Sequence, residues 1–212
     1  MASVQIAVLA RAAVAGAAKT RLIPALGADG AAALQAALTV QALRRASATG
    51  LRIVLWVAGT PDDGLRRECA ALQLAWRPQP SGDLGDRMLA AVAHAHATGA
   101  ACLVIGTDCP AQTPADLLHA AALLDTHDVV LQPAHDGGYV LIGMRQPRPQ
   151  LFSQMPWGGN TICAQTLAAC RRFGLQVAQL RPLPDLDRPA DLAQAIAAGA
   201  IAAGTIAADA SR

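Results

Sequence analysis

Lys19 is the only lysine among the 17 basic residues of this chain, and it lies in the segment Gly16-Ala-Ala-Lys-Thr-Arg-Leu22. A lysine ammonium is a compact, flexible cation with three hydrogen-bond donors, which suits a phosphate oxygen. Arg21 adds a planar guanidinium two residues later, so one glycine-containing loop carries two cations. We interpret this segment as a phosphate-binding loop; the alternative is a solvated turn with incidental charge.

A second candidate is Ile105-Gly-Thr-Asp-Cys-Pro110, where an apolar run leads into Thr107 and Asp108. Ligands bind at the carboxyl ends of strands in open α/β sheets. Asp108 at such an end is suited to hold a divalent cation, which in turn bridges phosphate oxygens. The alternative is a turn-forming aspartate ahead of a proline-led helix.

Two further segments carry carboxylates between expected elements. His135 precedes Asp136-Gly-Gly-Tyr139, whose glycines allow positive φ and close approach of a ligand, although Asp-Gly is also a common hairpin turn. In Asp185-Leu-Asp187 the side-chain alternation of an extended segment directs both carboxylates to one side, where they could share a cation. The alternative role of Asp187 is to cap the final helix.

A glycine loop, Gly82-Asp-Leu-Gly-Asp-Arg87, enters an expected helix and is suited to hold a base or a ribose, or is a plain helix start. Other motifs are missing. Alanines replace both glycines of a Walker loop in residues 13–20, and no G-x-G-x-x-G or G-x-S-x-G is present. His94 and His96 point in different directions on a helix and do not make a metal pair. These observations disfavour Walker-type NTPases, dinucleotide enzymes and α/β-hydrolases.

Composition indicates a folded globular chain, with 53% hydrophobic and 15% charged residues in 212. A net charge of +2 without a basic run disfavours nucleic acid and membrane surfaces as partners. The five cysteines include no Cys-x-x-Cys pair, and the first ten residues lack a positive leader region. We therefore expect a cytoplasmic protein.

Short β-branched runs alternate with alanine-rich helical stretches along the whole chain. Strands are expected at 4–9, 51–57, 74–77, 101–106, 128–132, 139–143 and 176–180, and helices at 29–48, 61–72, 84–98, from 113–114 onward, at 160–173 and at 189–198. This alternation predicts an α/β sandwich with a mostly parallel sheet. One domain is expected over residues 1–212, with a tail that frays after about residue 204.

In their order, these motifs resemble a bacterial family of GT-A-fold, glycosyltransferase-like proteins in the nucleotide-diphospho-sugar transferase superfamily, associated with radical-SAM and arsenosugar-type gene clusters. The segments that carry the resemblance are Lys19-Thr-Arg-Leu22, Gly82-Asp-Leu-Gly-Asp-Arg-Met88, Gly106-Thr-Asp-Cys-Pro110, Asp136-Gly-Gly-Tyr-Val-Leu-Ile-Gly143, Pro156-Trp157 and Asp185-Leu-Asp187. The Lys-Thr-Arg-Leu and Asp-Gly-Gly segments more distantly resemble guanylyltransferases that make a deazaflavin-cofactor precursor. The resemblance implies a three-layer α/β/α sandwich with a mixed, mostly parallel central sheet.

The resemblance also implies roles for individual residues. Lys19 and Arg21 would hold phosphates, and Asp108 would bind Mg²⁺ or Mn²⁺ together with Asp185 and Asp187. The catalytic candidates are Lys19, Arg21, Asp108 and Asp136. The expected substrate-binding residues are Arg11, Gly16, Thr20, Gly82, Asp83, Arg87, Thr107, His135, Gly137, Gly138, Tyr139 and Trp157. Asp83 and Arg87 would lie near the nucleoside, and the 136–139 segment would line the acceptor pocket.

The expected chemistry is metal-assisted displacement at an activated nucleotide, with a small-molecule acceptor. Glycosyl transfer from a nucleoside-diphosphate sugar needs a general base, which His135 or Asp136 could supply. The presence of these candidate bases slightly favours glycosyl transfer. Nucleotidyl transfer to an acceptor phosphate, with diphosphate release, needs no base and is the alternative. A nucleotide-binding module without catalysis is the third possibility.

Overall fold

A computed structural model describes residues 3–153 and 155–201. Seven strands form one sheet in the order β3-β2-β1-β4-β6-β5-β7. The strands are β1 (Val4–Arg11), β2 (Arg52–Ala58), β3 (Ala75–Pro78), β4 (Ala101–Ile105), β5 (Val129–Pro133), β6 (Tyr139–Met144) and β7 (Val177–Gln179). Strand β6 runs antiparallel to β4 and β5, and every other pairing is parallel. The prediction of a mixed, mostly parallel sheet is confirmed.

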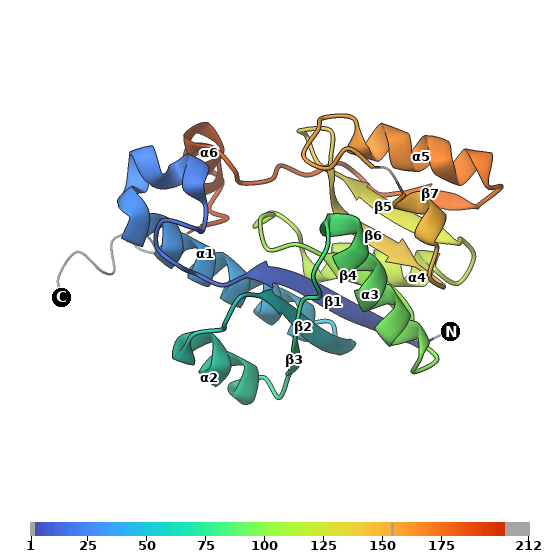
Figure 1. Cartoon of the computed structure of the whole chain (residues 1–212), viewed down its shortest axis with the longest axis horizontal. Helices are drawn as coiled ribbons and strands as arrows, with labels where there is room; N and C mark the ends of the chain where they lie inside the picture. Colours follow the sequence, from blue (N-terminus) through green and yellow to red (C-terminus); the bar gives the residue numbers. More distant parts are fainter. Residues whose placement is uncertain (1–2, 154, 202–212) are drawn as a thin grey trace.

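Helices cover both faces of this sheet (Figure 1). The helices are α1 (Ile23–Ser47), α2 (Asp63–Ala71), α3 (Leu84–His96), α4 (Pro114–Leu123), α5 (Ile162–Arg172) and α6 (Pro189–Ala197), with 3₁₀ turns η1 (Thr20–Leu22) and η2 (Pro149–Leu151). One buried cluster joins the sheet to α1, α2 and α4, and another joins it to α3 and α5. The fold is therefore the expected three-layer α/β/α sandwich.

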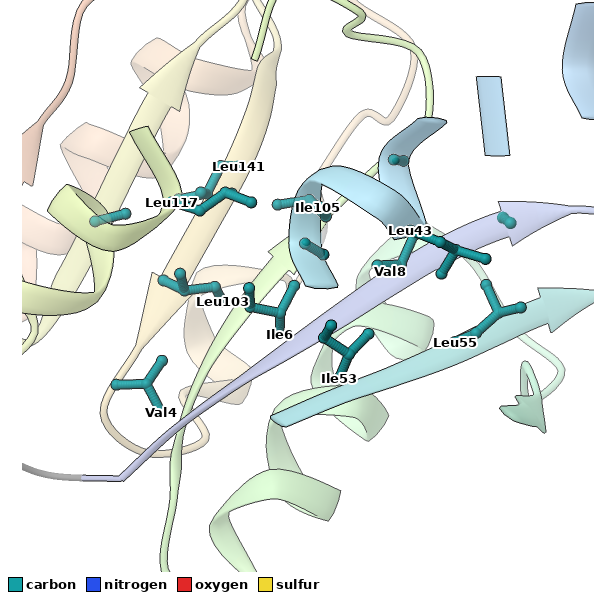
Figure 2. Packing of buried hydrophobic residues seen from close by; sticks show 14 of the residues in the cluster. Val4, Ile6, Val8, Leu43, Ile53, Leu55, Leu103, Ile105, Leu117 and Leu141 are labelled. Atoms are coloured by element: carbon teal, nitrogen blue, oxygen red, sulfur yellow. The ribbon is translucent and has the colours of Figure 1, made fainter. Parts of the chain in front are cut away.

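The sequence of strand β1 is apolar almost throughout, and the position of the strand in the sheet explains this composition. Val4, Ile6 and Val8 belong to the cluster that includes Leu43 of α1, as Figure 2 shows, whereas Ala7 belongs to the cluster on the opposite face. Hydrogen-bonded neighbours β2 and β4 close both edges of the strand. Because a central strand is covered on both faces, it reads as a continuous hydrophobic run.

Every expected strand, and every helix after the first, is present within about two residues of its predicted ends. Helix α1 is the exception, because it begins at Ile23 rather than Asp29. Its backbone leaves the helical region at Gly27 (φ 72°, ψ 171°), so a short helical turn precedes the longer helix that the sequence predicts. The tail after residue 204 lies outside the described residues.

The helical stretch Thr20–Ser47 is long and apolar enough to cross a membrane by length and composition alone. Core helices of soluble proteins meet the same criterion. Ala42 and Leu43 of this stretch are fully buried in the cluster against the sheet.

Three segments distant in the sequence meet at one edge of the sheet. In the parallel register Arg11 pairs with Ala58 and Val8 with Ile105, so β1, β2 and β4 end on the same side. The backbone N–H of Leu186, in the segment before α6, donates to the carbonyl of Asp108 at 2.7 Å. The loop after β4 and the segment that leads to α6 are thereby held together.

Candidate active site

A cavity of about 650 Å³ opens at this edge of the sheet. Its wall contains the following residues from the set predicted by the sequence: Arg11, Lys19, Thr20, Arg21, Arg87, Thr107, Asp108, Asp136, Gly138, Tyr139, Trp157, Asp185 and Asp187. These residues come from the end of β1 and the loop after it, the loop after β4, the β5–β6 turn and the start of β6, α3, and the segments before α5 and α6. Most of the predicted residues thus line one cavity that is open to solvent.

Two contacts fix the side chain of Lys19, which lies in the segment between β1 and α1 (residues 12–22) that we call the first loop. Its side chain is 3% exposed, and Nζ lies 2.9 Å from Oδ1 of Asp108 and donates to the carbonyl oxygen of Leu186 at 2.5 Å. Its backbone is left-handed (φ 47°, ψ 44°), an arrangement that costs a non-glycine residue about 1 kcal/mol. The ammonium is therefore fixed and largely shielded from water, beside a carboxylate that is half exposed.

Arg21 forms an ion pair with Asp187, so the first loop contacts the segment before α6 a second time. Asp187 does not cap α6, because the N-cap residue is Arg188. Instead, Oδ2 of Asp191 accepts hydrogen bonds from the backbone amides of Asp187 and Arg188, at 3.1 and 2.7 Å. The carboxylate of Asp187 is therefore not used as a helix cap and pairs with Arg21 instead.

A buried chain of hydrogen bonds leads to Asp108 from α1. Nε2 of Gln35 donates to the hydroxyls of Thr39 and Thr107 at 3.2 and 3.1 Å, and all three residues are buried. Thr107 Oγ1 in turn donates to Oδ1 of Asp108 at 3.1 Å. The carboxylate is therefore oriented by Thr107 from one direction and by Lys19 from another.

The carboxylates at this site suit a hard divalent cation by their chemistry. Burial raises the pKa of Asp185, and the neighbouring charges of Asp136, Asp191 and Asp187 raise it further. A bound cation would relieve this repulsion, and aspartate oxygens are the donors that Mg²⁺ and Mn²⁺ prefer. Within residues 3–153 and 155–201, no three His, Cys, Asp or Glu side chains converge as a preformed metal site. Magnesium commonly takes only one or two carboxylates, with phosphates and water as its other ligands.

Five predicted residues lie outside the cavity wall: Gly16, Gly82, Asp83, His135 and Gly137. Asp83 is the N-cap of α3, because its Oδ1 accepts from the backbone amide of Asp86 at 3.0 Å, while Oδ2 of Asp86 accepts from the backbone amide of Asp83 at 3.0 Å. Gly82 has a φ of 112°, and a Cβ there would collide with the Asp86 side chain. The helix-start alternative therefore accounts for both of these residues.

The Asp136-Gly137 segment forms the turn of the β5–β6 hairpin. Oδ1 of Asp136 accepts from the amide of Gly138 at 2.8 Å, while Gly137 has a φ of 92°. A Cβ on Gly137 would lie 1.9 Å from the carbonyl oxygen of Asn160. This glycine therefore allows the backbone at Asn160, rather than a ligand, to approach closely. His135 is exposed, and its amide donates to the carbonyl of Leu183. The hairpin alternative holds, although Asp136 and Gly138 still face the cavity.

Two glutamines that line the cavity wall, Gln35 and Gln79, were not predicted from the sequence. Gln35 lies on an alanine-rich helix and Gln79 between two prolines, and neither position resembles a motif. Their participation depends on tertiary contacts, which leave no local signal in the sequence.

The fold and this site define an α/β protein of the nucleotide-dependent transferase class. The chain belongs to the family described as an uncharacterized protein conserved in bacteria (DUF2064), whose model matches residues 39–159. It is 34% identical over 162 residues to the 3-phospho-D-glycerate guanylyltransferase of Phenylobacterium zucineum, an alignment that covers 73% of this chain and 72% of that protein.

Solved structures agree with this assignment. A proposed nucleotide-diphospho-sugar transferase from Desulfovibrio desulfuricans superposes with a TM-score of 0.86 at 27% identity, covering 98% of this chain and 94% of the other. The 4-diphosphocytidyl-2C-methyl-D-erythritol synthase of Anaerococcus prevotii has a TM-score of 0.63 at 10% identity, over 93% of this chain and 98% of that one. The second likeness concerns the fold alone. The sequence-based assignment to a GT-A-like transferase family with guanylyltransferase relatives is confirmed.

Proposed function

We propose that this protein is a metal-dependent nucleotidyltransferase that joins a nucleoside triphosphate to a phosphorylated small molecule and releases diphosphate. The observation that carries the proposal is the pairing of Lys19 with Asp108 and of Arg21 with Asp187 along one cavity wall. Two cations and at least two carboxylates beside one another are what a polyphosphate and its cation require.

In this reaction an acceptor phosphate oxygen attacks the α-phosphorus, and the bond from that phosphorus to the bridging oxygen of the β-phosphate breaks. Diphosphate leaves with the electron pair of the broken bond. Lys19 and Arg21 stabilise the negative charge on the phosphate oxygens, and Asp108, Asp185 and Asp187 would hold Mg²⁺ or Mn²⁺. The cation, when bound, supplies further neutralisation of charge on the polyphosphate.

Nucleotidyl transfer is favoured over glycosyl transfer by two observations. His135, a candidate general base, is exposed and lies outside the cavity wall. An acceptor phosphate is already anionic and needs no base, and the relative at 34% identity is named as a guanylyltransferase. Glycosyl transfer remains the second candidate because Asp136 does line the cavity and could serve as the base.

The test is to supply purified protein and Mn²⁺ or Mg²⁺ with each nucleoside triphosphate and a panel of phosphorylated carboxylic acids, and to measure diphosphate. Parallel reactions with nucleoside-diphosphate sugars measure nucleoside-diphosphate release. Diphosphate release that depends on an acceptor supports the proposal. Release of nucleoside diphosphate alone would establish glycosyl transfer, and binding without turnover would indicate a non-catalytic module.

We also infer that the reaction takes place in the cytoplasm. All five cysteines lie within the described part of the chain, where each is buried and free of a disulfide. Free thiols are maintained in a reducing compartment. Fractionation of the native cells with an antibody against the protein would test the location.

A further inference from the structure

Both cations of the first loop are paired with carboxylates that the proposed function assigns to the divalent cation. Nζ of Lys19 lies 2.9 Å from Oδ1 of Asp108, and Arg21 forms an ion pair with Asp187. All of these residues line the same cavity. The two carboxylates are therefore already neutralised by side chains of the protein itself.

The contact between Lys19 and Asp108 is the more shielded of the two ion pairs. The Lys19 side chain is 3% exposed, whereas the side chain of Arg21 is 63% exposed. Oδ1 of Asp108 also accepts from the hydroxyl of Thr107, so this oxygen already has two donors. A divalent cation on the same carboxylate would share it with the ammonium, and two like charges beside one carboxylate repel each other. Salt and water screen this repulsion poorly where one of the charges is buried.

The third carboxylate, Asp185, does not make a metal site by itself. Among the residues that the structure describes, no three His, Cys, Asp or Glu side chains form a group that could hold a metal ion. The other two carboxylates, Asp108 and Asp187, already have cationic partners. Magnesium therefore needs phosphate oxygens to complete its ligands at this site.

The backbone of the first loop is anchored, so we expect the ion pairs to exchange partners through movement of side chains. Leu22, directly after Arg21, is fully buried in a cluster with Leu34 of α1 and Leu186. The ammonium of Lys19 lies at the end of a flexible four-carbon stem. A polyphosphate carries several negative charges, against one on a carboxylate, and so attracts both cations more strongly.

We propose that Lys19 and Arg21 are internal counter-ions, which keep a divalent cation off Asp108 and Asp187 until a polyphosphate takes over both positive charges. This inference rests on the proposed function, because it assigns the polyphosphate and the cation to one cavity. The protein alone then binds the metal weakly, and metal and triphosphate bind cooperatively. Each of the two ligands raises the affinity for the other, as thermodynamic linkage requires.

The first test measures Mn²⁺ binding to the full chain without nucleotide, from the loss of the electron paramagnetic resonance signal of free Mn²⁺. Lys19→Met removes the counter-ion of Asp108 and should lower the Mn²⁺ dissociation constant roughly tenfold, because a repelling charge beside the dication is lost. Arg21→Met should lower it by a smaller factor, since its ion pair is more exposed and better screened. Arg21→Met also takes the place of Lys19→Met if the latter does not fold.

Arg11→Met is the matched control for loss of a cation from the cavity wall. Arg11 lines the same cavity, is exposed, and forms no ion pair with any residue in the described part of the chain. Its charge is screened, so the control should keep the wild-type Mn²⁺ affinity. If Lys19 only held Asp108 in place, Lys19→Met would bind Mn²⁺ more weakly than the wild type. Unchanged or weaker binding by the folded variant, or an equal gain in Arg11→Met, overturns this inference while the proposed function stands.

The second test uses the single lysine of the chain. Protein labelled with carbon-13 at lysine Cε gives one nuclear magnetic resonance signal, which reports the surroundings of the Lys19 ammonium. We expect this signal to move when Mg²⁺ and a nucleoside triphosphate are added together, each triphosphate being tried in turn, and to stay in place with Mg²⁺ alone. An equal movement with Mg²⁺ alone overturns this inference. If no triphosphate moves the signal, Lys19 does not meet the phosphates, and both this inference and the proposed function fail.

Discussion

Lys19 combines a strained backbone, a nearly buried side chain and contact with a carboxylate. If this position served only as a turn, we would expect glycine, because glycine adopts the left-handed backbone conformation without a steric cost. We predict that Lys19→Met lowers turnover by hundreds-fold, since removing one group that stabilises developing charge typically costs about 3 kcal/mol. The measurement is the rate of diphosphate release, with circular dichroism to confirm folding.

Arg171→Met, at an exposed position on α5, is a matched loss of one cation and should leave the rate unchanged. Full turnover by a well-folded Lys19→Met protein would remove Lys19 from the reaction.

Thr107 orients Asp108 through its hydroxyl, and Gln35 holds Thr107 from behind. Thr107→Val keeps the shape but removes the hydroxyl that donates to the carboxylate. We predict that the Mg²⁺ concentration for half-maximal activity rises roughly tenfold, because a hydrogen bond to a charged group contributes about 1.5–3 kcal/mol. Thr107→Ser keeps the hydroxyl and should show the wild-type Mg²⁺ concentration for half-maximal activity. If Thr107→Val also shows the wild-type value, Thr107 does not orient Asp108 for metal binding.

Residue type made some of these positions visible before the structure was known. Lys19, Asp108 and Asp187 stand out because charged residues are scarce in this chain and each follows an apolar run or a glycine loop. Gln35 and Gln79 could not be predicted, because each acts through contacts with residues far away along the chain. A glutamine on a helix or in a loop has no pattern that distinguishes a cavity position from a solvated one.

At the scale of elements, Gly137 in the turn of the β5–β6 hairpin packs against the backbone of Asn160, just before α5. Gly137→Ala combines a positive φ with a Cβ placed 1.9 Å from the Asn160 carbonyl oxygen, so backbone must move. We predict a loss of roughly 3 kcal/mol in the free energy of unfolding. Gly174→Ala, where φ is 64° and nothing lies within 4 Å, isolates the backbone strain alone and should cost about 1 kcal/mol.

Urea unfolding of both variants measures the difference between them. Equal losses for Gly137→Ala and Gly174→Ala would show that the hairpin adjusts to the extra methyl group.

Helices α1 and α2 are joined by the ion pair of Arg44 and Glu68, whose atoms Nε and Oε1 lie 2.7 Å apart. The hydrogen bond and charge of Arg44 lower the pKa of Glu68. A carboxyl whose folded pKa is depressed stabilises the protein above its unfolded pKa of about 4.3, and the contribution is lost as pH falls through the folded value. Arg44→Met should therefore melt slightly below the wild type at pH 7, and equally with it at about pH 2.5.

Because the Arg44 side chain is largely exposed, this effect is expected to be small. Thermal melts at the two pH values provide the measurement, with Arg171→Met as the control for loss of an arginine. A difference between Arg44→Met and wild type that persists in acid would assign the effect to lost packing of the arginine stem.

The order of the strands determines the site at the scale of the whole molecule. Alternating strands and helices predicted the layers, because the periodicity of each segment is local. The position of β6 between β4 and β5 was not predicted, since pairing partners depend on the complete chain. Its antiparallel pairing with β5 was foreseen only as the hairpin alternative for Asp136-Gly137. The convergence of the first loop on the segment before α6 was expected from the resemblance and is observed in the contacts of Lys19 and Arg21.

Because the site joins the loop after β1 to the loop after β4 and to the segment before α6, ligand binding should stabilise the molecule as a unit. A nucleoside triphosphate with Mg²⁺ at about 100 times its dissociation constant adds about 2.7 kcal/mol to the free energy of unfolding. For a chain of this size, that corresponds to a rise of roughly 5–10 °C in Tm. Thermal shift measurements with and without EDTA separate the contribution of the cation. Lys19→Met should lose most of the rise, because its ammonium helps to bind the phosphates; an equal rise in that variant would place the polyphosphate elsewhere.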